Sequence, residues 1–314
     1  MAAPPGALPP GASERRVEFS NAKGEVLVGT LVDTGAAGVA LICHGYMANK
    51  DMCKFPALAA ALAAAGVSSL RFDHACAWRG ESQRAGPFLM GNHEDEVQDM
   101  QAASSFLRDQ GRRVLALVGH SKGGTNVLRH AALVGDIPRV VWLAGRFRVR
   151  DGTLARVSRH TGVCAAPAVH FVELPVQNEA WPAGRRASAA PPTNRLPACL
   201  PPQFGADILD RLAVEKSILR CEADGFEWTM TEADFVERAT TDTVGYAAAV
   251  KAGGRVALLC VHGRGDRTIP FQESEECAAA AGAQLAIVDG DHNWTRPADA
   301  AQMIAAVVEF VTKP

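Results

Sequence analysis

The sequence predicts an α/β protein, built on a mainly parallel, twisted β-sheet with helices on both faces and a small inserted lid. Short apolar runs recur along the 314 residues and are too continuous for strands that keep one face in water. Stretches of helical length separate most of these runs. This alternation is typical of a parallel sheet covered on both sides, and 48% hydrophobic residues suffice for a large core.

The N-terminal part precedes this alternation. Residues 1–14 hold four of the 18 prolines and are expected to form a flexible leader. Arg16–Ser20 and Val26–Val32 are joined by the turn sequence Asn21–Gly24, which predicts an antiparallel hairpin at the start of the sheet.

The remaining strands and helices follow in order. The apolar runs predict strands buried on both faces at Val39–Cys43, Ser68–Phe72, Val114–Val118, Val140–Leu143, Val256–Val261 and Gln284–Val288. Helical spacing, in several cases closed by a glycine, predicts helices at Phe55–Ala65, Glu96–Arg108, Thr125–Val134, Phe271–Ala281 and Ala298–Val311.

One segment interrupts the pattern. Residues 158–203 carry eight of the 18 prolines and no sustained periodicity, so we expect them to be largely unstructured. Their composition suits either a tolerated loop or a translated intron, and the sequence does not separate the two. A helix at Ala206–Ala213, a hairpin of Ile218–Cys221 with Phe226–Thr229, and a helix at Thr231–Ala239 are predicted to follow as the lid.

These elements divide the chain into five parts. They are a leader at 1–14, the N-terminal part of the core at 15–157, the proline-rich insert at 158–203, the lid at 204–246 and the C-terminal part of the core at 247–314. The lid residues Phe226, Trp228, Met230 and Phe235 suit equally an apolar pocket wall or a small core of their own.

Composition excludes several classes of function. The formal net charge of −2 and the lack of a long single-sign run argue against a nucleic-acid partner. No apolar stretch reaches the ~20 residues of a membrane span, and the N-terminus lacks the apolar segment of a secretory signal. We therefore expect a cytoplasmic protein, with a short plastid-targeting leader at Met1–Arg16 left open. Nothing in the sequence predicts an oligomeric state.

The cysteines do not indicate disulfides or a metal site. Eight are present without a C-x-x-C pair, and Cys43 and Cys260 lie within apolar runs, where cysteine packs as a small hydrophobic residue. We expect free thiols and no bound metal.

The residues that carry chemistry follow the strands. Gly119-His120-Ser121-Lys122-Gly123 is a G-x-S-x-G motif placed between a predicted strand and a predicted helix. This context presents a serine hydroxyl on a sharp turn that stands clear of the sheet, which suits a nucleophile. Without the flanking strand and helix the motif is a weak signal, and an idle serine on a glycine-rich turn is its structural alternative.

A serine nucleophile needs a histidine base and a carboxylate that orients it. Asp266 lies on the loop after Val256–Val261, and His292 on the loop after Gln284–Val288. The carboxyl ends of parallel strands meet at one edge of a sheet, so Ser121, Asp266 and His292 are expected to converge there. Asp291 is the competing acid, although its adjacency to His292 in sequence disfavours it. His262 precedes its loop and is interpreted as structural.

Attack on an acyl carbon also requires donors for the developing oxyanion. We expect these to be the backbone amides of Lys122 and of Tyr46, which follows the strand Val39–Cys43 in the sequence His44-Gly45-Tyr46. The ammonium group of Lys122 is expected at the surface.

These motifs together resemble the α/β-hydrolase superfamily, in particular its small esterase and lipase-like branch of cinnamoyl (feruloyl) esterases and related plant-type serine hydrolases. The resemblance covers about residues 25–155 and 203–313; the proline-rich insert matches nothing in that branch. It implies Ser121, Asp266 and His292 as a catalytic triad, with Tyr46 and Lys122 as the oxyanion hole. The expected function is hydrolysis of a small-molecule acyl ester through an acyl-enzyme, with no metal or organic cofactor.

Three alternatives remain open from the sequence. The same triad serves serine aminopeptidases and thioesterases, because the bond cleaved depends on the pocket. A hydrolase fold can also act as a non-catalytic small-molecule receptor, although such a receptor has no use for a complete triad.

Overall fold

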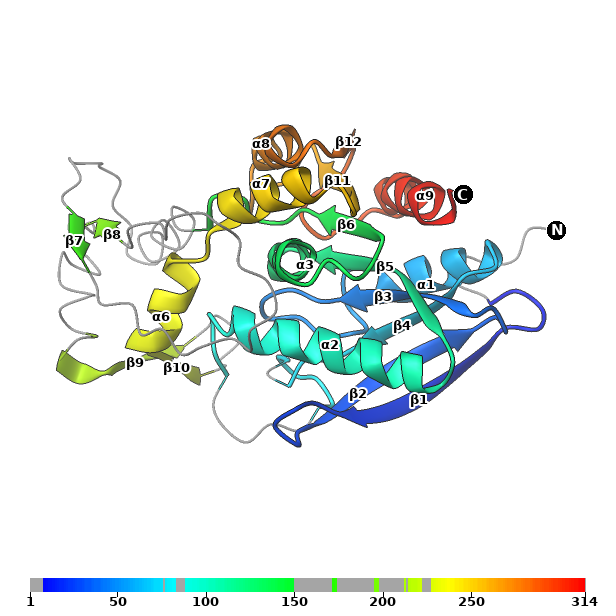
Figure 1. The fold of residues 1–314 in the computed structure, drawn as a ribbon, viewed down its shortest axis with the longest axis horizontal. Coiled ribbons are helices and arrows are strands. Elements are labelled where there is room, and N and C mark those ends of the chain that lie inside the picture. The colour runs from blue at the N-terminus through cyan, green and yellow to red at the C-terminus, as the bar shows by residue number, and fades with distance from the viewer. Residues whose placement is uncertain are drawn as a thin grey trace. The chain divides into compact units, whose positions relative to one another are not determined.

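The computed structural model describes residues 8–75, 77–82, 88–149, 171–173, 195–197, 212, 214–221 and 227–313. The chain divides into two compact units, one formed by residues 1–148 with 242–314 and the other by residues 149–241 (Figure 1). Among the described residues, no helix combines the length and apolar character needed to cross a membrane.

The first unit contains an eight-stranded sheet in the order β1-β2-β4-β3-β5-β6-β11-β12. The hairpin of β1 (Ser13–Ser20) and β2 (Val26–Asp33) is antiparallel, and β2 pairs antiparallel with β4. The other strands pair in parallel and are β3 (Gly38–Cys43), β4 (Ser68–Phe72), β5 (Arg113–His120), β6 (Arg139–Leu143), β11 (Ala257–Gly263) and β12 (Gln284–Val288). The predicted mainly parallel sheet is confirmed.

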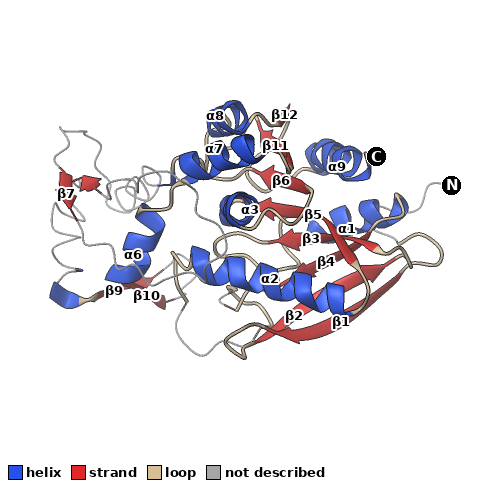
Figure 2. Cartoon of the chain, in the orientation of Figure 1, coloured by secondary structure: helices blue, strands red, loops and turns tan. Residues whose placement is uncertain are grey.

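Helices cover both faces of this sheet (Figure 2). One face packs against α1 (Phe55–Ala64) and α9 (Pro297–Thr312), and the other against α2 (His93–Asp109), α3 (Lys122–Leu133), α7 (Thr243–Gly253) and α8 (Gln272–Ala281). The central strands contribute side chains to the core on both faces of the sheet, since Leu41 belongs to one core cluster and Ile42 to the other. This double burial explains the continuous apolar runs.

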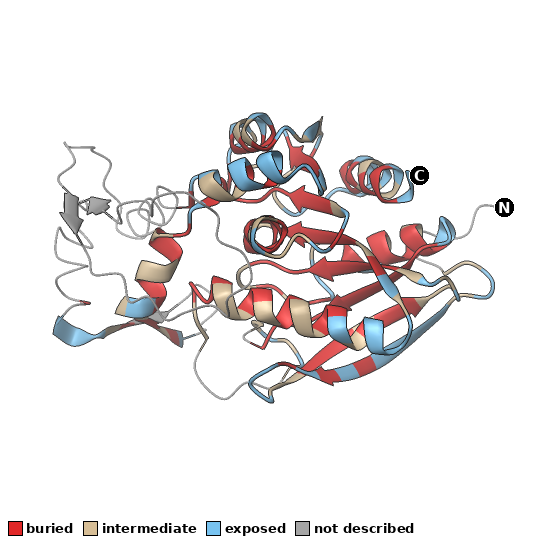
Figure 3. Ribbon diagram, in the orientation of Figure 1, coloured by how far each residue is buried: buried red, intermediate tan, exposed pale blue. Residues whose placement is uncertain are grey.

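The edges of the sheet differ from its centre (Figure 3). We expected Gln284–Val288 to be buried on both faces, and this expectation is wrong. As β12 it is the last strand of the described sheet and pairs with β11, and Leu285 is 42% exposed. An apolar run can therefore also mark an edge strand. At the opposite edge, β1 begins at Ser13, within the segment expected to be leader.

The sequence analysis missed helix α7. Residues 243–253 are rich in alanine and lack a clear apolar stripe, and we had assigned the first of them to the lid. Asp242 caps the helix by accepting a hydrogen bond from the amide of Gly245 at 2.9 Å, and Gly254 ends it at φ 59°. Ala247 and Val250 pack into the core beside α3 and α8, which assigns α7 to the first unit.

The second unit contains short elements. β9 (Ser217–Cys221) and β10 (Glu227–Thr231) form an antiparallel pair where the sequence predicts the lid hairpin, and α6 (Glu232–Ala239) follows. Within the proline-rich insert the structure adds an antiparallel pair that the sequence did not predict, β7 (Phe171–Glu173) with β8 (Arg195–Pro197). The rest of the insert and nearly all of the predicted helix 206–213 lie outside the described residues.

Candidate active site

Ser121 is the single residue between β5 and α3. Its backbone has φ 55° and ψ −116°, a conformation that an L-residue adopts only under strain of about 1–3 kcal/mol. Its amide donates to the carbonyl of Leu143 at 2.9 Å, and its carbonyl accepts from the amide of Thr125 at 3.2 Å. The turn is thus fixed on both sides with the Ser121 side chain on the carboxyl edge of the sheet.

The glycines of the motif permit this turn. A Cβ on Gly119 would lie 2.2 Å from the carbonyl oxygen of Gly123, and one on Gly123 would lie 2.5 Å from that of His44. Both distances are too short for any side chain. The G-x-S-x-G spacing therefore reflects how closely α3 and the loop after β3 approach the serine.

A chain of two hydrogen bonds links the three predicted site residues. His292 Nε2 lies 3.1 Å from Ser121 Oγ, and His292 Nδ1 lies 2.7 Å from Asp266 Oδ2. The carboxylate accepts, so Nδ1 carries the proton and Nε2 is free to accept from the serine hydroxyl. The structure thus brings the side chains of Ser121, His292 and Asp266 together, and their catalytic role remains a prediction.

Asp266 is held as an anion. Its Oδ1 accepts from the amides of Thr268 at 2.7 Å and Ile269 at 2.9 Å. Burial would raise the pKa of Asp266, but hydrogen bonds from His262 and His292 outweigh it and leave the pKa well below the ordinary value. The group that must accept from His292 is therefore ionised across the physiological range.

The loop that carries His292 is fixed to its neighbours. His120 Nε2 donates to the His292 carbonyl at 2.8 Å, and the amide of Gly265 donates to the Gly290 carbonyl at 2.9 Å. Burial, with the charge of His292, lowers the pKa of His120 to about 3, so this donor ring is neutral. The end of β5 and the loops after β11 and β12 are thereby joined by hydrogen bonds.

Asp291, the competing acid, has other partners. Its Oδ1 accepts from the amides of Asn293 at 3.0 Å and Thr295 at 3.1 Å, and its Oδ2 accepts from the Thr295 hydroxyl. The Asp291 carboxylate therefore stabilises the turn after His292, while Asp266 contacts the imidazole.

The loop after β3 lies directly against the serine turn. A Cβ on Gly45 would be 2.9 Å from Ser121 Cβ and 3.4 Å from the Lys122 amide nitrogen. Gly45 immediately precedes Tyr46, so the two segments predicted to supply the oxyanion donors lie beside the serine. The role of the Tyr46 and Lys122 amides remains a prediction.

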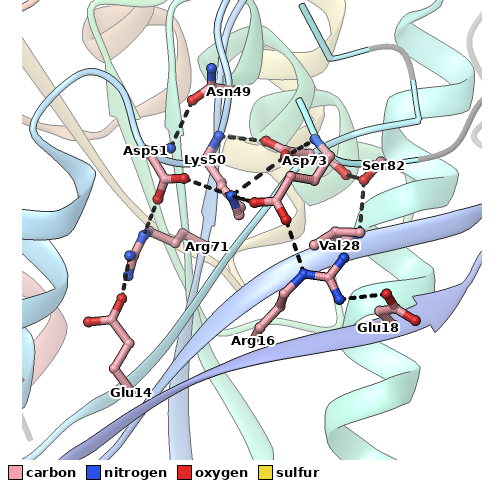
Figure 4. Close-up of polar contacts among 11 residues, drawn as sticks. Glu14, Arg16, Glu18, Val28, Asn49, Lys50, Asp51, Arg71, Asp73 and Ser82 are labelled. Carbon is pink, nitrogen blue, oxygen red and sulfur yellow. Dashed lines mark hydrogen bonds and ion pairs between the residues drawn. The ribbon is translucent and has the colours of Figure 1, made fainter. Parts of the chain in front are cut away.

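A polar network centred on Asp73, the residue after β4, anchors the same loop (Figure 4). Asp73 is fully buried, and its carboxylate accepts from the amides of Lys50 at 2.7 Å and Glu81 at 2.8 Å. The Lys50 ammonium contacts Asp51 at 2.7 Å and also Glu81. At the start of the loop, the His74 amide donates to His44 Nε2 at 3.1 Å. Sequence reasoning did not assign these residues a role, because the contacts join segments distant in sequence.

The ammonium of Lys122 is not at the surface, and that expectation is wrong. Its Nζ is buried and donates to Glu96 Oε1 at 2.8 Å and to Asn92 Oδ1. Asn126 donates to the other oxygen of Glu96. Because α3 begins at Lys122, its first turn faces the start of α2. The sequence does carry a signal for this contact. Asn92 and Glu96, and likewise Lys122 and Asn126, are four residues apart and so lie on one face of a helix.

Breaking this buried pair is expected to destabilise the fold. Glu96→Gln leaves the Lys122 ammonium buried without a counter-charge, so we expect the free energy of unfolding at pH 7 to fall by about 3 kcal/mol. Urea unfolding measures it. Glu309→Gln, which breaks the exposed pair with Lys313, is the control and should change stability by less than about 0.5 kcal/mol.

The loss of stability in Glu96→Gln should also depend on pH. Burial would raise the pKa of Glu96, but Lys122 and the nearby His74 and His44 lower it from 4.5 to about 2. Its stabilisation is therefore complete above pH 4.5 and is lost as pH falls towards 2. The difference in free energy of unfolding between wild type and Glu96→Gln should therefore decrease as the pH is lowered from 7 to 3. An unchanged difference would contradict this account.

Gly45→Ala tests the close approach of the loop to the serine turn. The added Cβ must displace the loop, and loss of one oxyanion donor costs about 10²-fold or more in kcat. We expect a loss of that size, measured as ester hydrolysis. Gly253→Ala at the end of α7 meets no atom within 4 Å and should keep full activity. Equal activity of the two variants would show that the loop does not take part.

The fold and this geometry define an α/β hydrolase. The chain belongs to the family described as serine aminopeptidase, S33, which it matches over residues 34–290. A search of curated proteins finds no match.

Solved structures support the same fold. The esterase Pf2001 of Pyrococcus furiosus has a TM-score of 0.61 at 16% identity, over 96% of this chain and 92% of its own. Est1E of Butyrivibrio proteoclasticus, solved with ferulic acid, has 0.62 at 14% identity, over 95% and 100%. The α/β hydrolase GrgF of Penicillium sp. sh18 has 0.62 at 16% identity, over 95% and 98%. These structures share the fold of this chain, and the family match confirms the resemblance to the α/β-hydrolase superfamily.

Proposed function

We propose that this hydrolase cleaves carboxylic esters through an acyl-enzyme on Ser121. The observation that carries the proposal is the chain of hydrogen bonds from Ser121 Oγ through His292 to Asp266, on a strained turn between strand and helix. The three side chains come from three separate turns or loops. The fold itself does not require them to be joined in this order, so the arrangement favours a catalytic role.

In this mechanism His292 Nε2 removes the proton from Ser121 as Oγ attacks the ester carbonyl. Asp266 stabilises the imidazolium that forms, because it is already ionised. The tetrahedral oxyanion is bound by the backbone amides of Tyr46 and Lys122.

The same imidazole completes the cycle. His292 returns its proton to the leaving alcohol and leaves Ser121 acylated. It then takes a proton from water, which attacks the acyl carbon, and Ser121 departs with that proton. No step requires a metal or organic cofactor, and the described residues hold no cluster of His, Cys, Asp and Glu suited to a metal ion.

The ester is favoured over other acyl bonds by the similarity to esterases, whereas the family description names aminopeptidases. A single panel separates them: p-nitrophenyl esters of graded acyl length and aromaticity, acyl thioesters, and aminoacyl p-nitroanilides. We expect the highest kcat/KM on an oxygen ester. A preference for an aminoacyl anilide with a free amino group would replace the esterase proposal with a peptidase.

A further inference from the structure

A second imidazole contacts the acid of the proposed triad. His262 lies near the end of β11, and its side chain is fully buried. Its Nε2 is 3.0 Å from Asp266 Oδ2, the same oxygen that faces His292 Nδ1 at 2.7 Å. One carboxylate oxygen thus lies between two rings.

The neighbours of His262 determine where its proton is. Nε2 is also 3.0 Å from the carbonyl oxygen of Ile269, and a carbonyl oxygen only accepts. Nε2 therefore carries hydrogen and donates to both Asp266 and Ile269. In the neutral ring Nδ1 is then the acceptor, and it lies 2.5 Å from Ser274 Oγ on α8. The Ser274 hydroxyl donates to Nδ1 and fixes this tautomer.

We infer that His262, oriented by Ser274, is a positioning residue for the hydrolase reaction: its Nε2–H holds Asp266 and reduces the negative charge that Oδ2 presents to His292. The inference rests on the proposed function of Ser121, His292 and Asp266. Two donors share one oxygen, so removing one strengthens the bond to the other. Without the His262 donor, Asp266 would stabilise protonated His292 more strongly, and the base would become available only at higher pH.

Other ionisable groups face the same atoms. From β5, the His120 ring packs against that of His292 with centroids 4.8 Å apart, and burial keeps its pKa low. From the His292 loop, Asp291 lies close enough that the charge of Asp266 opposes the ionisation of the Asp291 carboxyl. Substitution at His262 leaves both groups in place, so a change in the pH profile reports on the Asp266 contact.

The experiment compares His262→Phe with His262→Gln. Phenylalanine keeps a ring of similar volume but removes the donor, whereas the glutamine amide nitrogen can occupy the position of Nε2. For the Phe variant we expect kcat to fall about tenfold with KM within about twofold. The acidic limb of its kcat/KM profile should move up by about half a pH unit or more. The Gln variant should have a kcat and an acidic limb close to those of wild type.

Ser274→Ala extends the test and keeps it valid if the Phe variant does not fold. Loss of the hydroxyl frees the tautomer of His262, so the acidic limb should move in the same direction by a smaller amount. The control is Ser104→Ala on α2, which removes a buried hydroxyl that makes no hydrogen bond with any residue the structure describes and should leave the pH profile unchanged.

The outcomes separate this inference from the proposed function. Failure of wild-type Ser121 to react with a fluorophosphonate would remove the proposed function itself. If wild type reacts and hydrolyses esters but the pH profiles of the Ser274 and His262 variants coincide with wild type, only the inference fails. Equal losses in His262→Phe and His262→Gln, without a shift in pH, would show that His262 serves packing alone.

Discussion

Ser121→Ala and His292→Ala are each expected to lower ester hydrolysis by about 10⁴-fold or more while the protein stays folded. The first removes the attacking oxygen and the second removes the group that takes its proton at 3.1 Å. Ser121 is partly exposed on its turn and His292 lies on a loop, so neither truncation opens a cavity in the core. Initial rates with an activated ester measure the loss, and circular dichroism verifies the fold.

The double variant makes this prediction sharper. Serine and histidine act as one unit, so once either is gone the other contributes little. The double variant should therefore hydrolyse the ester at about the rate of the less active single variant. A double variant slower by the product of the two single losses would mean that each residue acts alone, and the proposed relay would be wrong.

Asp266→Asn is expected to reduce kcat by about 10³-fold or more, with little change in KM. Asparagine has nearly the same shape, but the atom facing His292 Nδ1 can become a donor, which reverses the tautomer that Ser121 requires. It also removes the charge that stabilises the imidazolium.

Asp291→Asn is the matched control, because it is the same substitution in the neighbouring carboxylate. Asp291 accepts from Asn293 and Thr295 at the turn, contacts that an asparagine oxygen can partly retain. We expect activity within about fivefold of wild type. Steady-state kinetics of the two variants measure the ranking, and the opposite order would assign the acid to Asp291.

Much of the sheet could be predicted because its physics is local. A parallel strand between two helical layers must be apolar at successive positions, and Val39–Cys43 shows this with alternate residues in the two core clusters. The same local signal did not distinguish the edge strand β12 from a central one, because exposure depends on which strands lie beside it.

The candidate site is predicted where a motif carries its own context. The flanking strand and helix indicate Ser121, the positions after strands indicate Asp266 and His292, and the structure places these three side chains within hydrogen-bond distance in a chain. Long-range partners had no such signal. The buried contact of Lys122 with Glu96 depends on how α3 packs on α2, and the contact of His262 with Asp266 depends on how the loop after β11 folds back.

The most direct measurement is covalent labelling by a fluorophosphonate, with the modified residue located by mass spectrometry. The account predicts stoichiometric labelling at Ser121, slow labelling of His292→Ala and none of Ser121→Ala, because only a hydroxyl activated by its imidazole attacks phosphorus readily. Labelling at another serine, or none in folded wild-type protein, would contradict the proposal that Ser121 is the nucleophile.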